Sequence, residues 1–313
     1  MSVASLLDSR LLLVTGKGGT GKTSFSAALA LLGAVKGRRT LLCEVDNHRP
    51  SMAAIFGHPP GLRPEEVLPN LDLVNVHWDV AIADYIERYV PARRLVTRIL
   101  KNKLVRRFID FTPGGRELFI LSRLTDFAAD YELMVVDMQA SGHAFSMLDI
   151  TRSALGVFRS GPMLKRVRAM IDTLQAPDTR MVFVSLPEEM VVNETIETRD
   201  RMVRGNLIGG PPLVFLNRAT LPSLTEGERS LIARLSEQDL EPLAREFVRA
   251  GFWEDTLEQA TAAAYERLAE VFPEPPVLIP PAGAGGVPRL VVARIAVHLG
   301  RMVGVTRREL PWI

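Results

Sequence analysis

A glycine-rich segment near the N-terminus has the residue types and spacing of a phosphate-binding loop. Residues 16–23 read GKGGTGKT, which fits the pattern G-x-x-x-x-G-K-[ST]. Glycines let the backbone turn tightly and point its N–H groups at phosphate oxygens, and a helix that starts there adds partial positive charge. In such a loop Lys22 is expected to reach the β- and γ-phosphates, and the Thr23 hydroxyl to bind Mg²⁺. The alternative is a glycine-rich turn that binds no ligand. The residues expected to contact a nucleotide here are Gly16, Gly18, Gly19, Thr20, Gly21, Lys22, Thr23 and Ser24.

Three polar residues lie where predicted strands end, at Asp46, Asp137 and Asn217. Ligands of open α/β sheets bind at the carboxyl ends of the strands, so these side chains are expected near the phosphate loop. Asp137 follows four apolar residues in the manner of a Walker B aspartate, whose carboxylate helps to hold Mg²⁺. The amide of Asn217 offers a donor and an acceptor together, which suits the edge of adenine. For Asp46 and for Asn217 the simpler interpretation is a turn residue.

Short apolar segments alternate with helical segments along most of the chain. Apolar runs that stop at a polar residue or a glycine are typical of buried parallel strands. The predicted strands are residues 11–15, 40–45, 71–76, 133–137, 180–185, 212–217 and 276–279, and the predicted helices are 20–35, 194–204, 226–248 and 257–271. This alternation predicts an α/β fold with a doubly wound, mostly parallel sheet of the P-loop NTPase type. We expect one domain over residues 1–313, with helical insertions around 81–126 and 153–176.

The composition narrows the possible partners. The 313 residues include 38 basic and 36 acidic side chains, so a net charge of +2 makes no case for a nucleic-acid partner. The sequence has no uninterrupted apolar run of about 18 residues and no recognisable signal peptide, so a cytoplasmic location is expected, with peripheral contact to a membrane as a variant. Cys43 is the only cysteine, which excludes a disulfide or a metal site made from several thiolates of one chain.

Lys17 adds a second lysine to the phosphate loop, and a generic loop of this kind does not need one. The form G-K-G-G-x-G-K-T resembles the deviant Walker A motif of the ATPases that include MinD, ParA, the nitrogenase iron protein and the ArsA-like anion pumps. In that class the early lysine crosses a dimer interface to the nucleotide of the partner. The resemblance implies that Lys17 neutralises charge that develops during phosphoryl transfer, in the way of an arginine finger. The alternative is a solvated surface lysine.

Other segments resemble the ArsA-like and tail-anchored-protein-targeting ATPases within this class. Residues 137–143, DMQASGH, resemble switch II of that family, and residues 185–195 resemble a strand–loop–helix segment of it. Gly142 has its counterpart there and allows the backbone to flip toward a γ-phosphate. His143 also has a counterpart, although a histidine without a role at a helix start is the alternative. The resemblance extends over residues 10–220 and becomes less specific after that.

The resemblance also assigns roles to the residues at the strand ends. It implies that Asp46, in switch I, orients the attacking water, and that Asn217 reads adenine. The segment 47–52 departs from the family pattern Asp-Pro-Ala-His, which leaves the neighbours of Asp46 undefined. Ala140 replaces a proline of switch II, which predicts a less rigid switch. The thiolates that bind metalloid or zinc in some members of the family have no counterpart in this chain.

Two stretches have the pattern of a surface for an apolar partner. Residues 91–109 contain seven basic and no acidic side chains, with apolar residues interleaved at helical spacing, and residues 153–176 add methionines to a similar pattern. In the targeting ATPases, helices inserted at these positions form an apolar groove for the transmembrane helix of a client. The alternative is a helical layer whose apolar side belongs to the core.

These observations predict a Mg²⁺- and ATP-dependent dimeric switch that hydrolyses ATP to ADP and phosphate. Its catalytic residues are expected to be Lys17, Lys22 and Asp46, and its metal ligands Thr23 and Asp137. The two subunits of the dimer are expected to be identical chains or paralogues. ATP hydrolysis is expected to be coupled to the handling of a client protein with an apolar helix, or of a membrane partner. The alternative is a MinD- or ParA-like positioning ATPase that acts on membrane or DNA.

Overall fold

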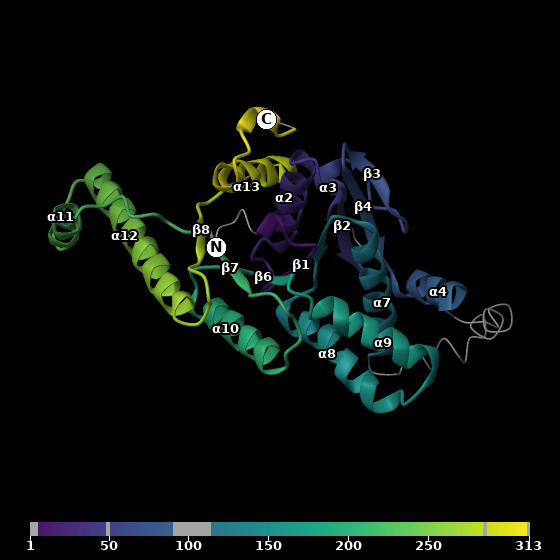
Figure 1. Cartoon of the computed structure of the whole chain (residues 1–313). Coiled ribbons are helices and arrows are strands. Elements are labelled where there is room, and N and C mark those ends of the chain that lie inside the picture. The colour runs from purple at the N-terminus through teal and green to yellow at the C-terminus, as the bar shows by residue number, and fades with distance from the viewer. Residues whose placement is uncertain (1–5, 48–50, 90–113, 284–286, 312–313) are drawn as a thin grey trace.

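The fold is an α/β arrangement built on one central sheet, seen in a computed structural model that describes residues 6–47, 51–89, 114–283 and 287–311 (Figure 1). The order across the sheet is β3-β4-β2-β5-β1-β6-β7-β8. Every neighbouring pair is parallel except β3 and β4. The predicted class, a mostly parallel sheet of the P-loop NTPase type, is confirmed. The strands are β1 (Leu11–Thr15), β2 (Thr40–Val45), β3 (Glu65–Leu68), β4 (Leu71–Val76), β5 (Leu133–Asp137), β6 (Thr179–Ser185), β7 (Leu213–Asn217) and β8 (Val277–Ile279).

Strand β3 is an addition to the predicted set. It forms an antiparallel edge with β4, and the turn between them contains Asn70 at a positive φ of 64°. Its Glu65 and Glu66 are exposed, as is common on an edge strand, where charge discourages pairing with another chain. A four-residue strand of this composition has no apolar run, so the pattern that identified the other strands does not detect it.

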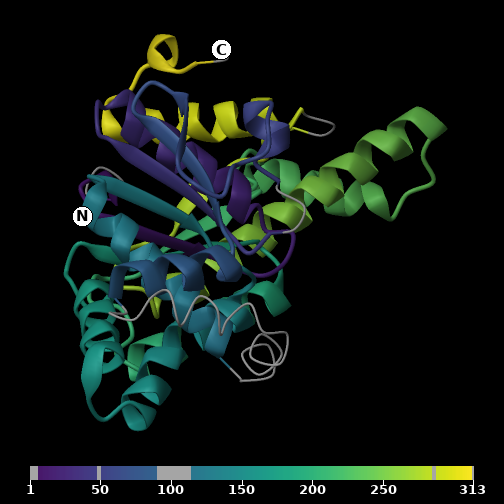
Figure 2. The same ribbon diagram turned by 90° about the vertical axis from the view of Figure 1, so that its right-hand side faces the viewer.

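Helices cover both faces of the sheet and create two separate cores (Figure 2). Because side chains alternate along a strand, Leu12 and Val14 of β1 face one core, and Leu11 and Leu13 face the other. The first core is covered by α2 (Lys22–Val35), α3 (Ala53–Phe56) and α13 (Pro288–Val303). The second is covered by α7 (Gly115–Asp130), α8 (Ser141–Val157), α9 (Gly161–Leu174) and α10 (Glu189–Arg204).

The two predicted helical insertions lie on the side of the second core. In the first, α4 (Trp78–Tyr89) packs on α7 through an edge-to-face contact of Tyr85 with Phe119, whose ring centroids are 5.3 Å apart. The basic stretch 91–109 lies outside the described residues. In the second, Val167 and Met170 of α9 are buried in the core. The structure therefore favours the core interpretation for the apolar side of residues 161–174.

An arm made of α11 (Glu226–Ser236) and α12 (Pro242–Ala269) projects from the body (Figures 1 and 2). The predicted boundaries, 226–248 and 257–271, were wrong: the chain breaks at residues 237–241 and then continues as one helix of 28 residues. Proline disfavours helical backbone in the residue before it and suits the first helical turn, so Pro242 begins the second helix instead of lying within the first.

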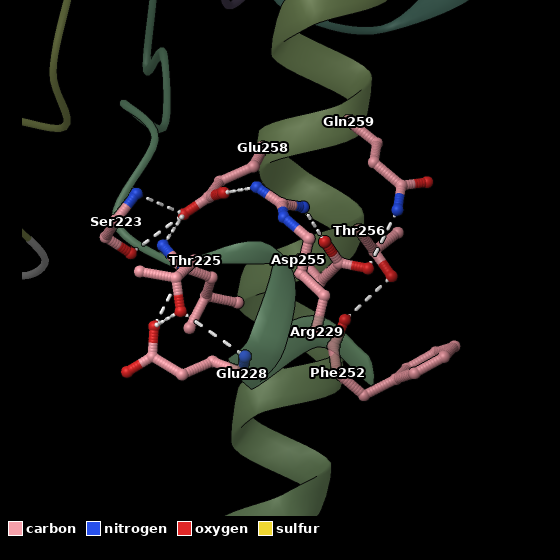
Figure 3. Close-up of polar contacts among 10 residues, drawn as sticks. Ser223, Thr225, Glu228, Arg229, Phe252, Asp255, Thr256, Glu258 and Gln259 are labelled. Atoms are coloured by element: carbon pink, nitrogen blue, oxygen red, sulfur yellow. Dashed lines mark hydrogen bonds and ion pairs between the residues drawn. The ribbon is translucent and has the colours of Figure 1, made fainter. Parts of the chain in front are cut away.

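The arm is held together by one polar cluster (Figure 3). Arg229 of α11 forms ion pairs with Asp255 and Glu258 of α12. Glu258 Oε1 also accepts hydrogen bonds from Ser223 N at 2.7 Å and Ser223 Oγ at 2.8 Å. Burial alone would raise the pKa of Glu258, but these hydrogen bonds and Arg229 lower it below its ordinary value. The cluster therefore joins the two helices of the arm by charge, with few buried apolar side chains between them.

Candidate functional site

The phosphate loop connects β1 to α2, as its motif requires. Gly16 has a φ of 153°, and a Cβ atom there would lie 2.2 Å from the carbonyl oxygen of Val184 on β6. Gly21 has a φ of 99°, and a Cβ there would lie 2.8 Å from Asn217 Nδ2. Both glycines are needed because the loop packs closely against neighbouring strand ends. Gly18 and Gly19 are exposed, at the tip of the loop.

The N-terminus of α2 presents free backbone donors beside Lys22. The first hydrogen bond of the helix joins Phe25 N to Gly21 O at 3.1 Å, so the amides of Lys22, Thr23 and Ser24 have no acceptor within the helix. Such amides, with the helix dipole, suit an anion. Lys22 Nζ donates to the carbonyl of Lys17 at 3.0 Å. Burial lowers the pKa of Lys22, and nearby carboxylates offset part of that change.

Thr23 and Asp137 are brought together across α2 and β5. Thr23 Oγ1 donates to Asp137 Oδ2 at 2.6 Å, and Ser26 Oγ donates to Asp137 Oδ1 at 3.3 Å. Burial raises the pKa of Asp137 to about 6; the nearby Glu44 carboxylate adds to this, while Thr23 and Lys22 oppose it. A hydroxyl and a carboxylate in contact at the base of a phosphate loop are hard oxygen donors, and this donor set fits Mg²⁺.

Glu44 lies beside Asp137 in the sheet, where the two are register partners on β2 and β5. Its side chain is only 1% exposed. Oε1 accepts hydrogen bonds from Asn47 Nδ2 at 3.1 Å, Ser51 N at 2.9 Å and Ser51 Oγ at 3.1 Å. Oε2 is buried and has no hydrogen-bond partner among the described residues.

Asp46 follows β2 directly and has a positive φ of 45°. Its N–H donates to Val76 O at 3.0 Å, and its Oδ1 lies 3.1 Å from Nδ1 of His77. The next residue is held in the same way, because Asn75 Nδ2 donates to Asn47 O at 2.7 Å. The start of switch I is therefore tied to the end of β4, one residue before α4 begins.

Lys17 interacts with the segment that resembles the family at residues 185–195. Lys17 Nζ lies 3.7 Å from Glu194 Oε2, and these side chains are 37% and 36% exposed. Ser141, the first residue of α8, donates to Glu194 Oε1. Glu194 thus links the loop lysine to switch II within one chain. Gly142 and His143 are exposed in the first turn of α8.

Asn217 lies beneath the phosphate loop at the end of β7. Its Nδ2 donates to Thr20 O at 2.8 Å, and its Oδ1 accepts from Arg218 N at 2.9 Å. In this arrangement the amide supports the loop.

Sequence reasoning missed three contributors to the site. Ser26 is one turn beyond Thr23 on α2, and this spacing puts both hydroxyls on one side of the helix. His77 directly follows the end of β4 at Val76, as Asp46 directly follows the end of β2 at Val45. Glu194 lay inside a segment noted for its resemblance, but nothing in its spacing predicted contact with Lys17.

The strand, phosphate loop, helix and facing aspartate together define a nucleotide-binding domain of the P-loop class. Residues 9–161 match the family described as anion-transporting ATPase. Together with the relatives below, this match shows that the chain is similar to the ArsA-like ATPases, and it supports ATP hydrolysis as the class of activity.

Three relatives illustrate the similarity. The ATPase BagA of Mycobacterium tuberculosis is 28% identical over 264 residues, covering 77% of this chain and 73% of that protein. The arsenical pump-driving ATPase of Escherichia coli is 24% identical over 258 residues, covering 74% of this chain and 43% of that protein. The protein of the same name from Acidiphilium multivorum gives the same identity and coverage.

The only cysteine of the sequence, Cys43, is buried. Cys43 is fully buried in β2, and burial raises its pKa well above the ordinary value. A thiolate is the form that binds soft metals, so Cys43 is not available for such a ligand in the folded chain. None of the described helices combines the length and the apolar character needed to cross a membrane.

Proposed function

We propose that the chain is a Mg²⁺-dependent ATPase that works as a nucleotide-driven dimeric switch. Its reaction is the attack of water on the γ-phosphate of ATP, which yields ADP and phosphate. The observation that carries the proposal is the contact of Thr23 with Asp137 beside the free amides and Lys22 of the phosphate loop. This constellation supplies a metal site and an anion site at one point.

Thr23 and Asp137 are the residues that would hold Mg²⁺, and the ion when bound would neutralise phosphate charge. Lys22 would exchange the Lys17 carbonyl for phosphate oxygens, because a partly buried ammonium gains more from an anion than from a neutral acceptor. Asp46 uses Oδ1 for His77, and we assign its other oxygen to the attacking water. Asn217 is assigned to the adenine side through the second N–H of its amide.

The position of Lys17 supports the dimeric part of the proposal. The loop tip is exposed at Gly18 and Gly19, so a second subunit has access to it. The ion pair of Lys17 with Glu194 is partly solvated, and such pairs contribute at most about 1 kcal/mol. Lys17 can therefore leave Glu194 for the phosphates of a partner's nucleotide at small cost.

The projecting arm is the surface that we assign to an apolar client. Phe247 and Trp253 of α12 are 79% and 57% exposed, and Leu243 and Phe252 of the same helix are also exposed. Exposed apolar groups gathered on one element mark interaction surfaces. This assignment moves the client surface from residues 161–174, whose apolar side is buried, to α12.

The test measures ATP hydrolysis and the molar mass of the protein in the same samples. Purified chain is assayed for phosphate release and for molar mass by light scattering, with ATP, with ADP and without nucleotide. We expect ATP-dependent doubling of mass, loss of hydrolysis in Lys22→Ala, and loss of both ATP-dependent mass and hydrolysis in Lys17→Ala. Full hydrolysis by a Lys17→Ala variant that stays monomeric would contradict the dimeric mechanism.

A further inference from the structure

The sheet carries a row of three polar side chains beneath the N-terminus of α2. Asn75, Glu44 and Asp137 are register partners on β4, β2 and β5. Each lies two residues beyond an apolar residue of the α2-side core, so all three face the same side. Thr23 and Ser26 of α2 meet this row at Asp137. Glu44 is thus the buried neighbour of the aspartate assigned to Mg²⁺.

The two oxygens of Glu44 have opposite surroundings. Oε1 accepts hydrogen bonds from Asn47, from the amide and hydroxyl of Ser51, and from Met52 N at 3.4 Å. Oε2 is buried and has no hydrogen-bond partner among the described residues. A buried carboxylate oxygen without a partner is costly, and the cost is greater here because a second carboxylate, Asp137, lies alongside.

The surroundings define which ligand would satisfy Oε2. A neutral donor would leave two neighbouring carboxylates in repulsion, so the ligand should carry positive charge. Among the described residues, the cation of the phosphate loop, Lys22, donates to the Lys17 carbonyl and is assigned to phosphate. A hydrated divalent cation supplies positive charge and O–H donors at once, and Mg²⁺ keeps several of its waters when bound to proteins.

We propose that Glu44 is a second acidic residue of the metal site, whose Oε2 accepts a hydrogen bond from the hydration shell of the nucleotide-bound Mg²⁺. This inference rests on the proposed function and adds a residue to it. The same side chain holds Ser51 and Met52 through Oε1. Glu44 therefore links the presence of the metal to the order of switch I.

The test measures binding of ADP by titration calorimetry, with Mg²⁺ and with EDTA. The ratio of the two affinities is the Mg²⁺ benefit. In Glu44→Gln we expect this benefit to fall about tenfold, while the affinity in EDTA stays equal or rises because a negative charge near the phosphates is removed. Ser51→Ala is the matched control, since it loosens the loop at Oε1 without touching Oε2, and its Mg²⁺ benefit should equal that of the wild type.

Two outcomes overturn the inference, and they are distinct. A full Mg²⁺ benefit in Glu44→Gln would refute the role of Glu44 and leave the proposed function standing. A wild-type chain without any Mg²⁺ benefit would refute both. If Glu44→Gln does not fold, hydrogen exchange of the wild type decides: we expect the amides of Ser51 and Met52 to be better protected with Mg²⁺ and ADP than with ADP and EDTA, and equal protection refutes the inference.

Discussion

Glu194 Oε2 lies 3.7 Å from Nζ of Lys17, the lysine that is assigned to the nucleotide of a partner subunit. The same carboxylate accepts a hydrogen bond from Ser141 in switch II. In the isolated chain, Glu194 therefore competes with any phosphate for Lys17. In the proposed dimeric mechanism, closure of the dimer would require this pair to open.

Glu194→Gln is expected to strengthen the ATP-dependent dimer by about two- to fivefold, because the pair is partly exposed and contributes at most about 1 kcal/mol. Glutamine keeps an oxygen that can accept from Ser141. The dissociation constant with a nonhydrolysable ATP analogue, from analytical ultracentrifugation, checks this. The same substitution in a Lys17→Ala background should not restore the dimer that Lys17→Ala is expected to lose, and a weaker dimer in the single variant would contradict the idea.

Asp137→Asn is expected to stabilise the ligand-free chain at neutral pH. The pKa of Asp137 is raised to about 6, so the folded chain prefers the protonated form. The contribution of Asp137 to the free energy of unfolding is fully present below pH about 4. It is lost as pH rises through about 6, and the loss amounts to up to about 3 kcal/mol. Urea unfolding in EDTA should therefore show a gain for the variant at pH 7.5 and little gain at pH 4. A gain that does not change with pH would contradict this account.

His77→Ala is expected to lower kcat about tenfold with little change in KM, because His77 pairs with the carboxylate of Asp46, to which we assign the attacking water. His77→Asn places an amide N–H near the position of Nδ1 and should restore much of the rate. His77→Gln places its N–H farther out and should not. Steady-state hydrolysis by the three variants measures this, and equal rates for the asparagine and alanine variants would argue against a positioning role.

Gly16→Ala is expected to destabilise the chain by about 2 kcal/mol or more, since its Cβ would lie 2.2 Å from the carbonyl oxygen of Val184. Gly18→Ala is the matched control in the same loop, because a Cβ at Gly18 meets no atom within 4 Å. Thermal unfolding followed by circular dichroism compares the two. Equal losses of stability would show that the loop does not pack on β6 as described.

Arg229→Ala is expected to loosen the arm without affecting the nucleotide site. The variant leaves the buried Glu258 without its cation, so α11 should detach from α12 (Figure 3). Hydrogen exchange in residues 223–236 should become about tenfold faster, while hydrolysis stays unchanged. Arg234→Ala, on the same helix and exposed, serves as the control. Unchanged exchange in Arg229→Ala would assign the stability of the arm to other contacts.

The local sequence pattern was sufficient to predict most of the strands and the phosphate loop with its facing aspartate. Most of the parallel strands are apolar runs buried on both faces, and such runs are visible in sequence. The phosphate loop is equally local, because its glycines and Lys22 lie within eight residues. The Thr23–Asp137 contact follows once a parallel sheet is assumed, since both residues lie at one edge of it.

The parts that were missed depend on contacts between distant segments. The pairing of Asp46 with His77 joins β2 to β4, and that of Lys17 with Glu194 joins the loop to α10. Neither partner has a distinctive spacing. The break before Pro242 was missed for another reason: the apolar residues on both sides continue a helical pattern, and the proline alone marks the new start.

Burial of Cys43 between Leu42 and Glu44 has a consequence for how this ATPase meets its surroundings. An oxidant, an alkylating reagent or a soft metal reaches the thiol only if β2 leaves the sheet, and β2 carries Glu44 and leads into Asp46. Chemical attack on the sulfur therefore requires displacement of the strand that positions Glu44 and Asp46. While β2 stays in the sheet, the thiol of Cys43 is shielded from oxidants in its environment.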